Sequence, residues 1–209
     1  MGSIRNYVGL DLGTTKISVV IAEPDDAGNL KIVGVGVAPS RGMRRGNVVN
    51  LEETAQSIRR AVAEAERMSG CLVKSVYAGI AGDHIKSLNS RGVIAVSRRD
   101  AEIGSSDVER VVEAARAVVI PADREVFHVI PQEFIVDDQG GIRDPIGMAG
   151  VRLEADVHIV TGGMTSARNL TRAIEKAGLR VETLVLEPLA SSQAVLTQDE
   201  RELGVACVD

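Results

Sequence analysis

Val8-Gly9-Leu10-Asp11-Leu12-Gly13-Thr14-Thr15-Lys16 is the stretch that decides the fold. It places a short polar turn between two apolar, β-branched segments, residues 7–10 and 17–23, which predict two strands joined as a hairpin. Gly13 tolerates backbone angles that other residues avoid and lets the chain approach an anion closely. The backbone N–H groups of residues 13–15 can then point at phosphate oxygens. The turn is therefore a candidate phosphate-binding loop.

The side chains of the turn suit the same ligand. The hydroxyls of Thr14 and Thr15 add donors, and Lys16 brings a compact positive charge for a β- or γ-phosphate. Asp11 is expected to hold Mg²⁺ through water, because this ion keeps much of its hydration shell. Taken alone, the motif also fits a polar β-turn that binds nothing. Neither a Walker P-loop nor a Gly-x-Gly-x-x-Gly fingerprint occurs in the chain.

The segments around this turn predict an α/β layered fold. The expected elements are strands at 7–10, 17–23, 30–39, 75–81, 181–187 and 205–208, and helices at 51–68, 165–177 and 188–196. The first three strands are linked by turns, which implies an antiparallel start to the sheet. Asn50 is expected to cap the helix at 51–68, and the strand at 75–81 then returns parallel after this crossover.

Between Gly82 and Gly163 the succession of expected strands and helices changes, and this change predicts a compact inserted α/β subdomain. Its expected elements are strands at 92–97 and 153–160, a helix at 105–119 and an extended segment at 125–136. Pro131 within that segment predicts an edge or a bulge.

The composition limits the class of protein. The net charge of the 209 residues is −5, so the composition lacks the excess of positive charge that is typical of nucleic-acid-binding proteins. The small basic clusters, such as Arg44 and Arg45, are expected to be solvated loops. No apolar run approaches the roughly 18 residues that cross a bilayer, and the polar first residues predict no signal peptide. Cys71 and Cys207 match no metal motif and are expected to be reduced packing residues.

Three phrases resemble the superfamily of ATP-binding proteins that includes actin, DnaK-type chaperones and sugar kinases. The first is the 8–16 stretch, which is similar to its first phosphate motif. The second, Glu187-Pro188-Leu189-Ala190-Ser191-Ser192, resembles its connecting motif, where the residue at the place of Glu187 orients a water. Alternatively, Glu187 is a carboxylate that serves a helix dipole. The third, Val205-Ala206-Cys207-Val208-Asp209, resembles the strand leading into the second phosphate motif and implies that Asp209 contributes to the nucleotide site.

The position of the insertion narrows the resemblance to the FtsA family of bacterial cell-division proteins. Actin, MreB and the chaperones insert a subdomain between the third strand and the first helix, where this chain has only residues 40–50. The insertion after 75–81 instead resembles FtsA, whose subdomain 1C replaces 1B. The phrases that resemble FtsA are residues 40–49, 78–85, 130–137, 144–154, 188–191 and 199–204. FtsA more often has Ser where Ala81 stands.

The resemblance implies a fold and a domain arrangement. The fold class is α/β, with an actin-like, ribonuclease H-like mixed sheet, flanking helices and a small inserted α/β subdomain of the SHS2 type. Residues 1–82 and 164–209 are expected to form subdomain 1A, discontinuous and truncated at its end, and residues 83–163 to form 1C. Subdomains 2A and 2B and the C-terminal membrane helix are expected to be absent.

The resemblance also implies ligands and a role. ATP and Mg²⁺ are the expected ligands, and the activity is at most a weak ATPase in a mainly structural protein. That protein forms filaments, helps to assemble the FtsZ ring and tethers it to the cytoplasmic membrane, and recruits later division proteins. With the second half of the cleft missing, we expect this chain alone to bind ATP poorly.

The implied partners are FtsZ through the missing half, further FtsA copies, and FtsN with other divisome proteins through 1C. Membrane is a partner of the full-length protein only, and nucleic acid is not a partner. The expected location is the cytoplasm, peripheral on the cytoplasmic face of the inner membrane at the division site. Two alternatives are a type IV pilus assembly protein of the PilM kind, which shares the 1C insertion, and an actin-like sugar kinase.

Overall fold

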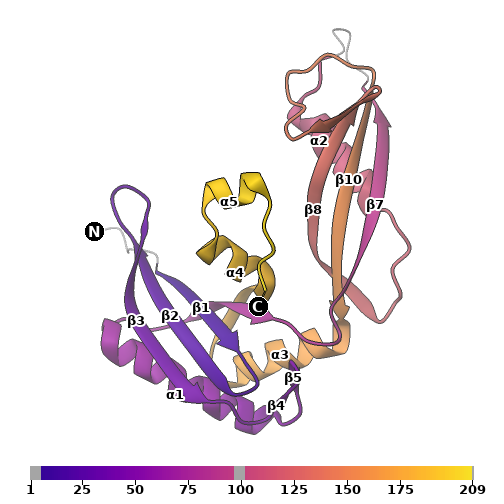
Figure 1. Cartoon of the computed structure of the whole chain (residues 1–209). Coiled ribbons are helices and arrows are strands. Elements are labelled where there is room, and N and C mark those ends of the chain that lie inside the picture. The colour runs from indigo at the N-terminus through magenta and orange to yellow at the C-terminus, as the bar shows by residue number, and fades with distance from the viewer. Residues whose placement is uncertain (1–5, 97–101, 209) are drawn as a thin grey trace. The chain divides into compact units, whose positions relative to one another are not determined.

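The computed structural model describes residues 6–96 and 102–208. The chain divides into two compact units, the first made of residues 1–84 and 164–209 and the second of residues 85–163. Both units are shown in Figure 1.

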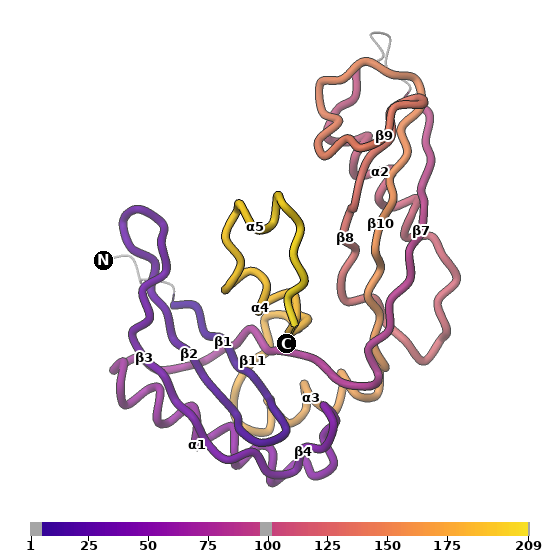
Figure 2. Tube along the Cα trace, viewed as in Figure 1, coloured from indigo at the N-terminus to yellow at the C-terminus, as the bar shows by residue number. Residues whose placement is uncertain are grey.

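A mixed five-stranded sheet forms the first unit, in the order β11-β6-β1-β2-β3. Its strands are β1 (Tyr7–Leu12), β2 (Lys16–Pro24), β3 (Leu30–Pro39), β6 (Ser75–Ile80) and β11 (Arg180–Leu186). The pairs β1–β2 and β2–β3 are antiparallel, whereas β1–β6 and β6–β11 are parallel. Figure 2 follows the hairpin from β1 through β2 to β3. The predicted antiparallel start and parallel return are therefore both present.

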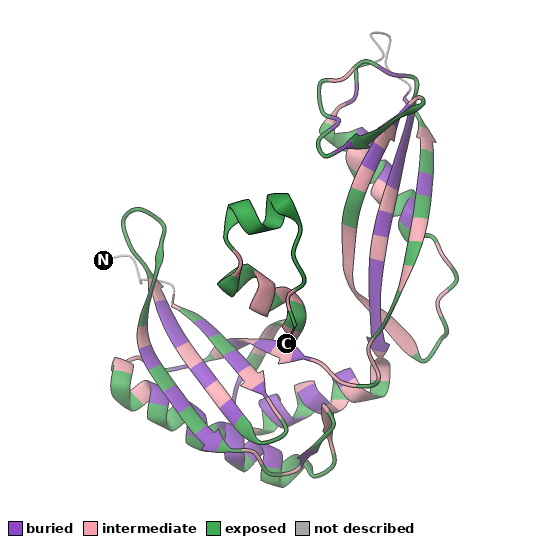
Figure 3. Cartoon of the chain, viewed as in Figure 1, coloured by how far each residue is buried: buried purple, intermediate pink, exposed green. Residues whose placement is uncertain are grey.

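Two helices cover one face of this sheet, α1 (Leu51–Ser69) and α3 (Met164–Lys176). As predicted, Asn50 caps α1, and its side-chain oxygen accepts the backbone N–H groups of Glu52 and Glu53 at 3.1 and 3.2 Å. The helix approaches β3 very closely, because a Cβ atom on Gly36 would lie 1.9 Å from the Ala61 carbonyl oxygen. The alternation of buried and exposed residues along the strands is visible in Figure 3. The core of this unit lies between the sheet and α1.

The other elements of this unit are short. They are β4 (Met43–Arg44), β5 (Asn47–Val48), α4 (Glu187–Val195) and α5 (Gln198–Leu203). The β4–β5 ribbon and α5 lay outside the sequence predictions. The predicted strand at 205–208 was wrong, since residues 204–208 have no regular structure. The reason is that a strand needs a neighbour with which to exchange backbone hydrogen bonds, and no described strand lies beside this segment.

The second unit is a four-stranded antiparallel sheet with one helix on its face. Its elements are β7 (Lys86–Ala95), α2 (Ser105–Arg116), β8 (Arg124–Val136), β9 (Gln139–Ile142) and β10 (Arg152–Gly163), with strand order β7-β10-β8-β9. The predicted irregularity at Pro131 is present, because the β8–β10 register shifts between Asp156 and Val157, where Val157 pairs with Pro131. Val111 and Ala115 of α2 pack into its core.

Within the described residues, no helix is both long enough and apolar enough to cross a membrane.

Candidate functional site

A cavity of about 480 Å³ opens in the first unit where several strands end. Strands β1, β6 and β11 are mutually parallel, so their carboxyl ends meet at one edge of the sheet. This edge is where ligands bind in open α/β sheets. The cavity is lined by Leu12, Gly13, Thr14, Met43, Arg45, Gly46, Gly79, Ile80, Ala81, Gly82, Asp83, Leu170 and Glu187.

The hairpin between β1 and β2 contributes one wall of the cavity. A Cβ atom on Gly13 would lie 2.8 Å from the backbone carbonyl oxygen of Lys16, so the turn is closed in a way that only glycine permits without a shift. The backbone N–H of Ser40 donates to the carbonyl oxygen of Thr15 at 3.0 Å and ties the turn to the end of β3. Thr14 and Thr15 are exposed at the tip of this turn. The hairpin is thus closely turned and anchored.

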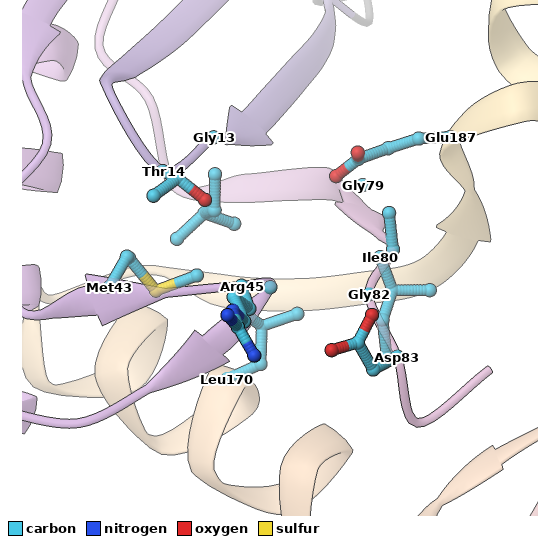
Figure 4. Close-up of a pocket in the computed structure, with 13 residues that line it drawn as sticks. Gly13, Thr14, Met43, Arg45, Gly79, Ile80, Gly82, Asp83, Leu170 and Glu187 are labelled. Atoms are coloured by element: carbon cyan, nitrogen blue, oxygen red, sulfur yellow. The ribbon is translucent and has the colours of Figure 1, made fainter. Parts of the chain in front are cut away.

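Glu187 lines the cavity from the side of the edge strand β11. It follows β11 directly and occupies the first turn of α4. Its side chain lies across β6, because a Cβ on Gly79 would stand 2.9 Å from both Cγ and Oε1 of Glu187. Figure 4 shows the Glu187 carboxylate directed toward this cavity beside Gly79. Glu187 begins a helix and also lines the cavity, and both interpretations of its role stay predictions.

The third wall comes from the connection between β3 and α1. The β4–β5 ribbon brings Arg45 and Gly46 to the cavity, and Asp83 reaches it from the segment after β6. In Figure 4, Arg45 and Asp83 lie on one side of the view, with Gly13, Thr14 and Glu187 on the other. Sequence reasoning did not identify Arg45, Asp83 or Gly79. The sequence signal for them was that all three lie in phrases that resemble FtsA, residues 40–49 and 78–85. Their meeting at one cavity depends on where the β4–β5 turn rests against the chain after β6.

A second cavity of about 740 Å³ adjoins the first on the face of the sheet away from α1. It shares Gly13, Gly79 and Glu187 with the first and extends toward α4. Its lining is mainly small and apolar, as at Val20, Ala190 and others. The two cavities therefore meet where β1, β6 and β11 end.

The predicted site residues are distributed unevenly between these cavities. Gly13, Thr14 and Glu187 line the first, and Asp11 lines the second. Thr15 and Lys16 line neither of them, and Lys16 is the exposed first residue of β2. Asp209 lies outside the described residues. Their predicted ligand contacts stay predictions.

The observed residues fit a phosphate group better than a directly bound metal. The close turn at Gly13 is of the kind found in anion-binding loops, and a Cβ there would press on the backbone carbonyl oxygen of Lys16. Across residues 6–96 and 102–208, no group of three or more His, Cys, Asp or Glu side chains is arranged to hold a metal ion. A magnesium ion that keeps its waters needs few protein ligands, so Asp11 alone remains compatible with the predicted water-mediated contact.

Comparisons with known proteins agree with the sequence phrases. The family model described as "SHS2 domain inserted in FTSA" matches residues 82–161. The cell division protein FtsA of Pseudomonas aeruginosa is 50% identical over 212 residues, covering 100% of this chain and 50% of that protein. FtsA of Escherichia coli K12 is 44% identical, covering 97% and 48%, and FtsA of Bacillus subtilis is 43% identical, covering 100% and 47%.

A solved structure supports the predicted fold class. The PilM–PilN type IV pilus biogenesis complex matches with a TM-score of 0.61 at 15% identity, covering 90% of this chain and 49% of that one. This likeness and the family match confirm the predicted actin-like α/β fold with an SHS2-type insertion. At so low an identity the PilM likeness shows the fold alone. By its sequence, the chain belongs to the FtsA family of cell-division proteins, and it spans about half the length of the curated relatives that it matches.

Proposed function

We propose that this chain provides the phosphate-binding wall of an ATP site in a cell-division scaffold. The observation that carries the proposal is the meeting of Gly13, Gly79 and Glu187, from three parallel strand ends, around the cavity of about 480 Å³. These residues are far apart in the sequence, and the order of the sheet brings them together. A cleft of this kind at the carboxyl edge of a sheet suits a small anionic ligand.

Each predicted residue has a role in this proposal. The backbone amides of Gly13, Thr14 and Thr15 bind phosphate oxygens, and Lys16 adds charge from the start of β2. ATP brings the anionic phosphate chain together with Mg²⁺. The Asp11 carboxylate would accept hydrogen bonds from the waters bound to that ion. Asp209 would contribute to the nucleotide site, as the family resemblance implies.

Glu187 is proposed to orient a water beside the terminal phosphate. Its carboxylate lies over Gly79 at the cavity wall, where it can accept a hydrogen bond from a water molecule. The proposed activity is at most a weak ATPase. The main role of the protein is then structural, and the nucleotide serves assembly.

The cellular role rests on the relatives, which are named cell division protein FtsA. We propose that the full-length protein assembles into filaments, links the FtsZ ring to the cytoplasmic face of the membrane, and recruits later division proteins such as FtsN. Co-sedimentation of the full-length protein with FtsZ polymers tests this role. A full-length protein that stays in the supernatant at every FtsZ concentration would contradict it.

Nucleotide binding can be tested on the chain itself. In a titration with ATP and Mg²⁺ followed by amide NMR shifts, we expect the largest shifts at Gly13, Thr14 and Thr15, with an affinity in the millimolar range. Gly13→Ala should weaken binding at least about tenfold, because its Cβ would press on the Lys16 carbonyl and reshape the turn. Gly140→Ala in the second unit is the matched control, since its Cβ would find only ordinary contacts. Shifts confined to other residues would refute the proposed site.

A further inference from the structure

We propose that Arg45 binds the outer phosphates of the nucleotide from the side of the cavity opposite the hairpin. This inference rests on the proposed nucleotide site and adds a binding residue to it. Of the described residues that line the cavity of about 480 Å³, Arg45 is the one with a basic side chain. The other charged residues of the lining are Asp83 and Glu187. A polyanion entering this cavity therefore depends on Arg45 for charge compensation from the lining itself.

The Arg45 guanidinium is available for such a ligand. Its side chain is exposed, and within residues 6–96 and 102–208 it makes no hydrogen bond or ion pair with another residue. Lys16, the cation expected from the sequence, does not line this cavity. The guanidinium group also matches phosphate geometry well, because it donates two parallel hydrogen bonds where a lysine acts as a point charge.

The backbone of Arg45 has an unusual conformation for this residue type. Arg45 and Gly46 form the two-residue connection between β4 and β5, with φ of +49° and +74°. Positive φ at both central positions is typical of a type I′ turn, whose first position favours Asn, Asp or Gly. Arginine there carries a steric cost that asparagine or glycine would reduce. Because arginine is unfavourable at this position of the turn, its presence suggests that the Arg45 side chain has a function.

The turn is also fixed in place. A Cβ atom on Gly46 would lie 2.2 Å from the carbonyl oxygen of Ala81, so the turn rests directly on the chain just after β6. Asn47 donates from Nδ2 to the carbonyl oxygen of Arg45 at 3.2 Å, and its Oδ1 accepts the hydroxyl of Ser166 at 2.7 Å. The Arg45 backbone is thereby positioned beside the cavity, and only its side chain has to order when a phosphate binds. Figure 4 shows this placement across from Gly13 and Thr14.

The test compares Arg45→Asn with Arg45→Lys and with the control Arg44→Asn. Asn suits the turn, so Arg45→Asn should melt no lower than the wild type while it loses the cation. Arg44 is the exposed neighbour on β4 and does not line the cavity. The probes are ATP and inorganic tripolyphosphate, each with Mg²⁺, measured by calorimetry and by the NMR signal of the Arg45 Nε–H group.

For Arg45→Asn we expect affinity for both probes to fall by about tenfold to a hundredfold, the loss expected for hydrogen bonds to a charged group. Arg45→Lys should recover part of that loss, and Arg44→Asn should bind like the wild type. If the wild type binds ATP and Arg45→Asn binds equally well, the inference is wrong and the proposed site stands. A loss for ATP alone places Arg45 at the nucleoside and also overturns it. A wild type that binds neither probe overturns this inference together with the proposed function.

Discussion

The side chain of Glu187 occupies the space that a methyl group on Gly79 would need. A Cβ on Gly79 would lie 2.9 Å from Glu187 Cγ, 2.9 Å from Oε1 and 3.3 Å from Cδ, and these are its three nearest neighbours. Gly79 therefore determines where the Glu187 carboxylate lies. Because Gly79 is in β6 and Glu187 begins α4 after β11, the relationship depends on the parallel pairing of the two strands.

Gly79→Ala should push the Glu187 side chain out of the cavity wall. We expect it to lower the free energy of unfolding by about 1–3 kcal/mol, as overpacking usually does. The near contacts are all with Glu187 atoms beyond Cβ, so the same substitution should cost much less in a Glu187→Ala background. A double-mutant cycle from urea unfolding measures this coupling. Equal costs in the two backgrounds would show that Glu187 does not occupy this position.

Gly36→Ala should separate α1 from the sheet. Its Cβ would lie 1.9 Å from the Ala61 carbonyl oxygen and 2.6 Å from the Ala65 backbone nitrogen, and neither backbone atom can move alone. We expect a loss of about 3 kcal/mol, measured by urea unfolding. Gly9→Ala is the control, because its Cβ would meet nothing within 4 Å. That substitution should be neutral or slightly stabilising, since alanine restricts the unfolded chain more than glycine does.

Glu64 protects the edge of the sheet at β3. One of its carboxylate oxygens accepts the backbone N–H of Val37 at 2.9 Å, and the sulfur of Met68 accepts that of Val35 at 3.2 Å. Glu64→Ala should destabilise the unit by about 1 kcal/mol and speed amide exchange at Val37. It should also raise the tendency to aggregate, because it frees a donor on an edge strand. Glu64→Gln keeps an acceptor oxygen and should preserve protection, and unchanged exchange in Glu64→Ala would contradict this role.

Glu52 links the start of α1 to the end of α3 in a pH-dependent way. Its carboxylate pairs with Lys176 Nζ at 3.0 Å and with Arg59 at 3.2 Å. These hydrogen bonds, that of Lys176 first, hold the pKa of Glu52 below its usual range. A lowered folded pKa stabilises the protein above the unfolded pKa of about 4.3, and this contribution is lost as pH falls through the folded value.

Glu52→Gln should therefore be less stable than the wild type at neutral pH, and the difference should shrink as pH falls below the unfolded pKa and vanish once pH is below the lowered folded pKa. Thermal melts of both proteins across this range measure it. The neighbouring Glu53→Gln is the control, because Glu53 forms none of the described ion pairs. A difference between Glu52→Gln and wild type that persists unchanged in acid would exclude the ion pairs as its cause.

Local chemistry explains what could be predicted from the sequence. The helix at 51–68 and its cap at Asn50 depend on interactions within a few residues, so they could be predicted without the fold. The β1–β2 hairpin around Gly13 is local in the same sense. The strand predicted at 205–208 failed because an apolar run becomes a strand only when another strand lies beside it.

The sequence by itself determined the phosphate-loop motif at Gly13, the order of the five sheet strands and of α1, α3 and α4 in the first unit, and the family resemblance. Only the tertiary structure decided which side chains share a cavity with that motif. Glu187 and Gly79 are brought to Gly13 by parallel pairing of β1, β6 and β11, and Arg45 by a turn that rests on Ala81. Such contacts follow from strand order and close packing between distant segments, which no local pattern encodes.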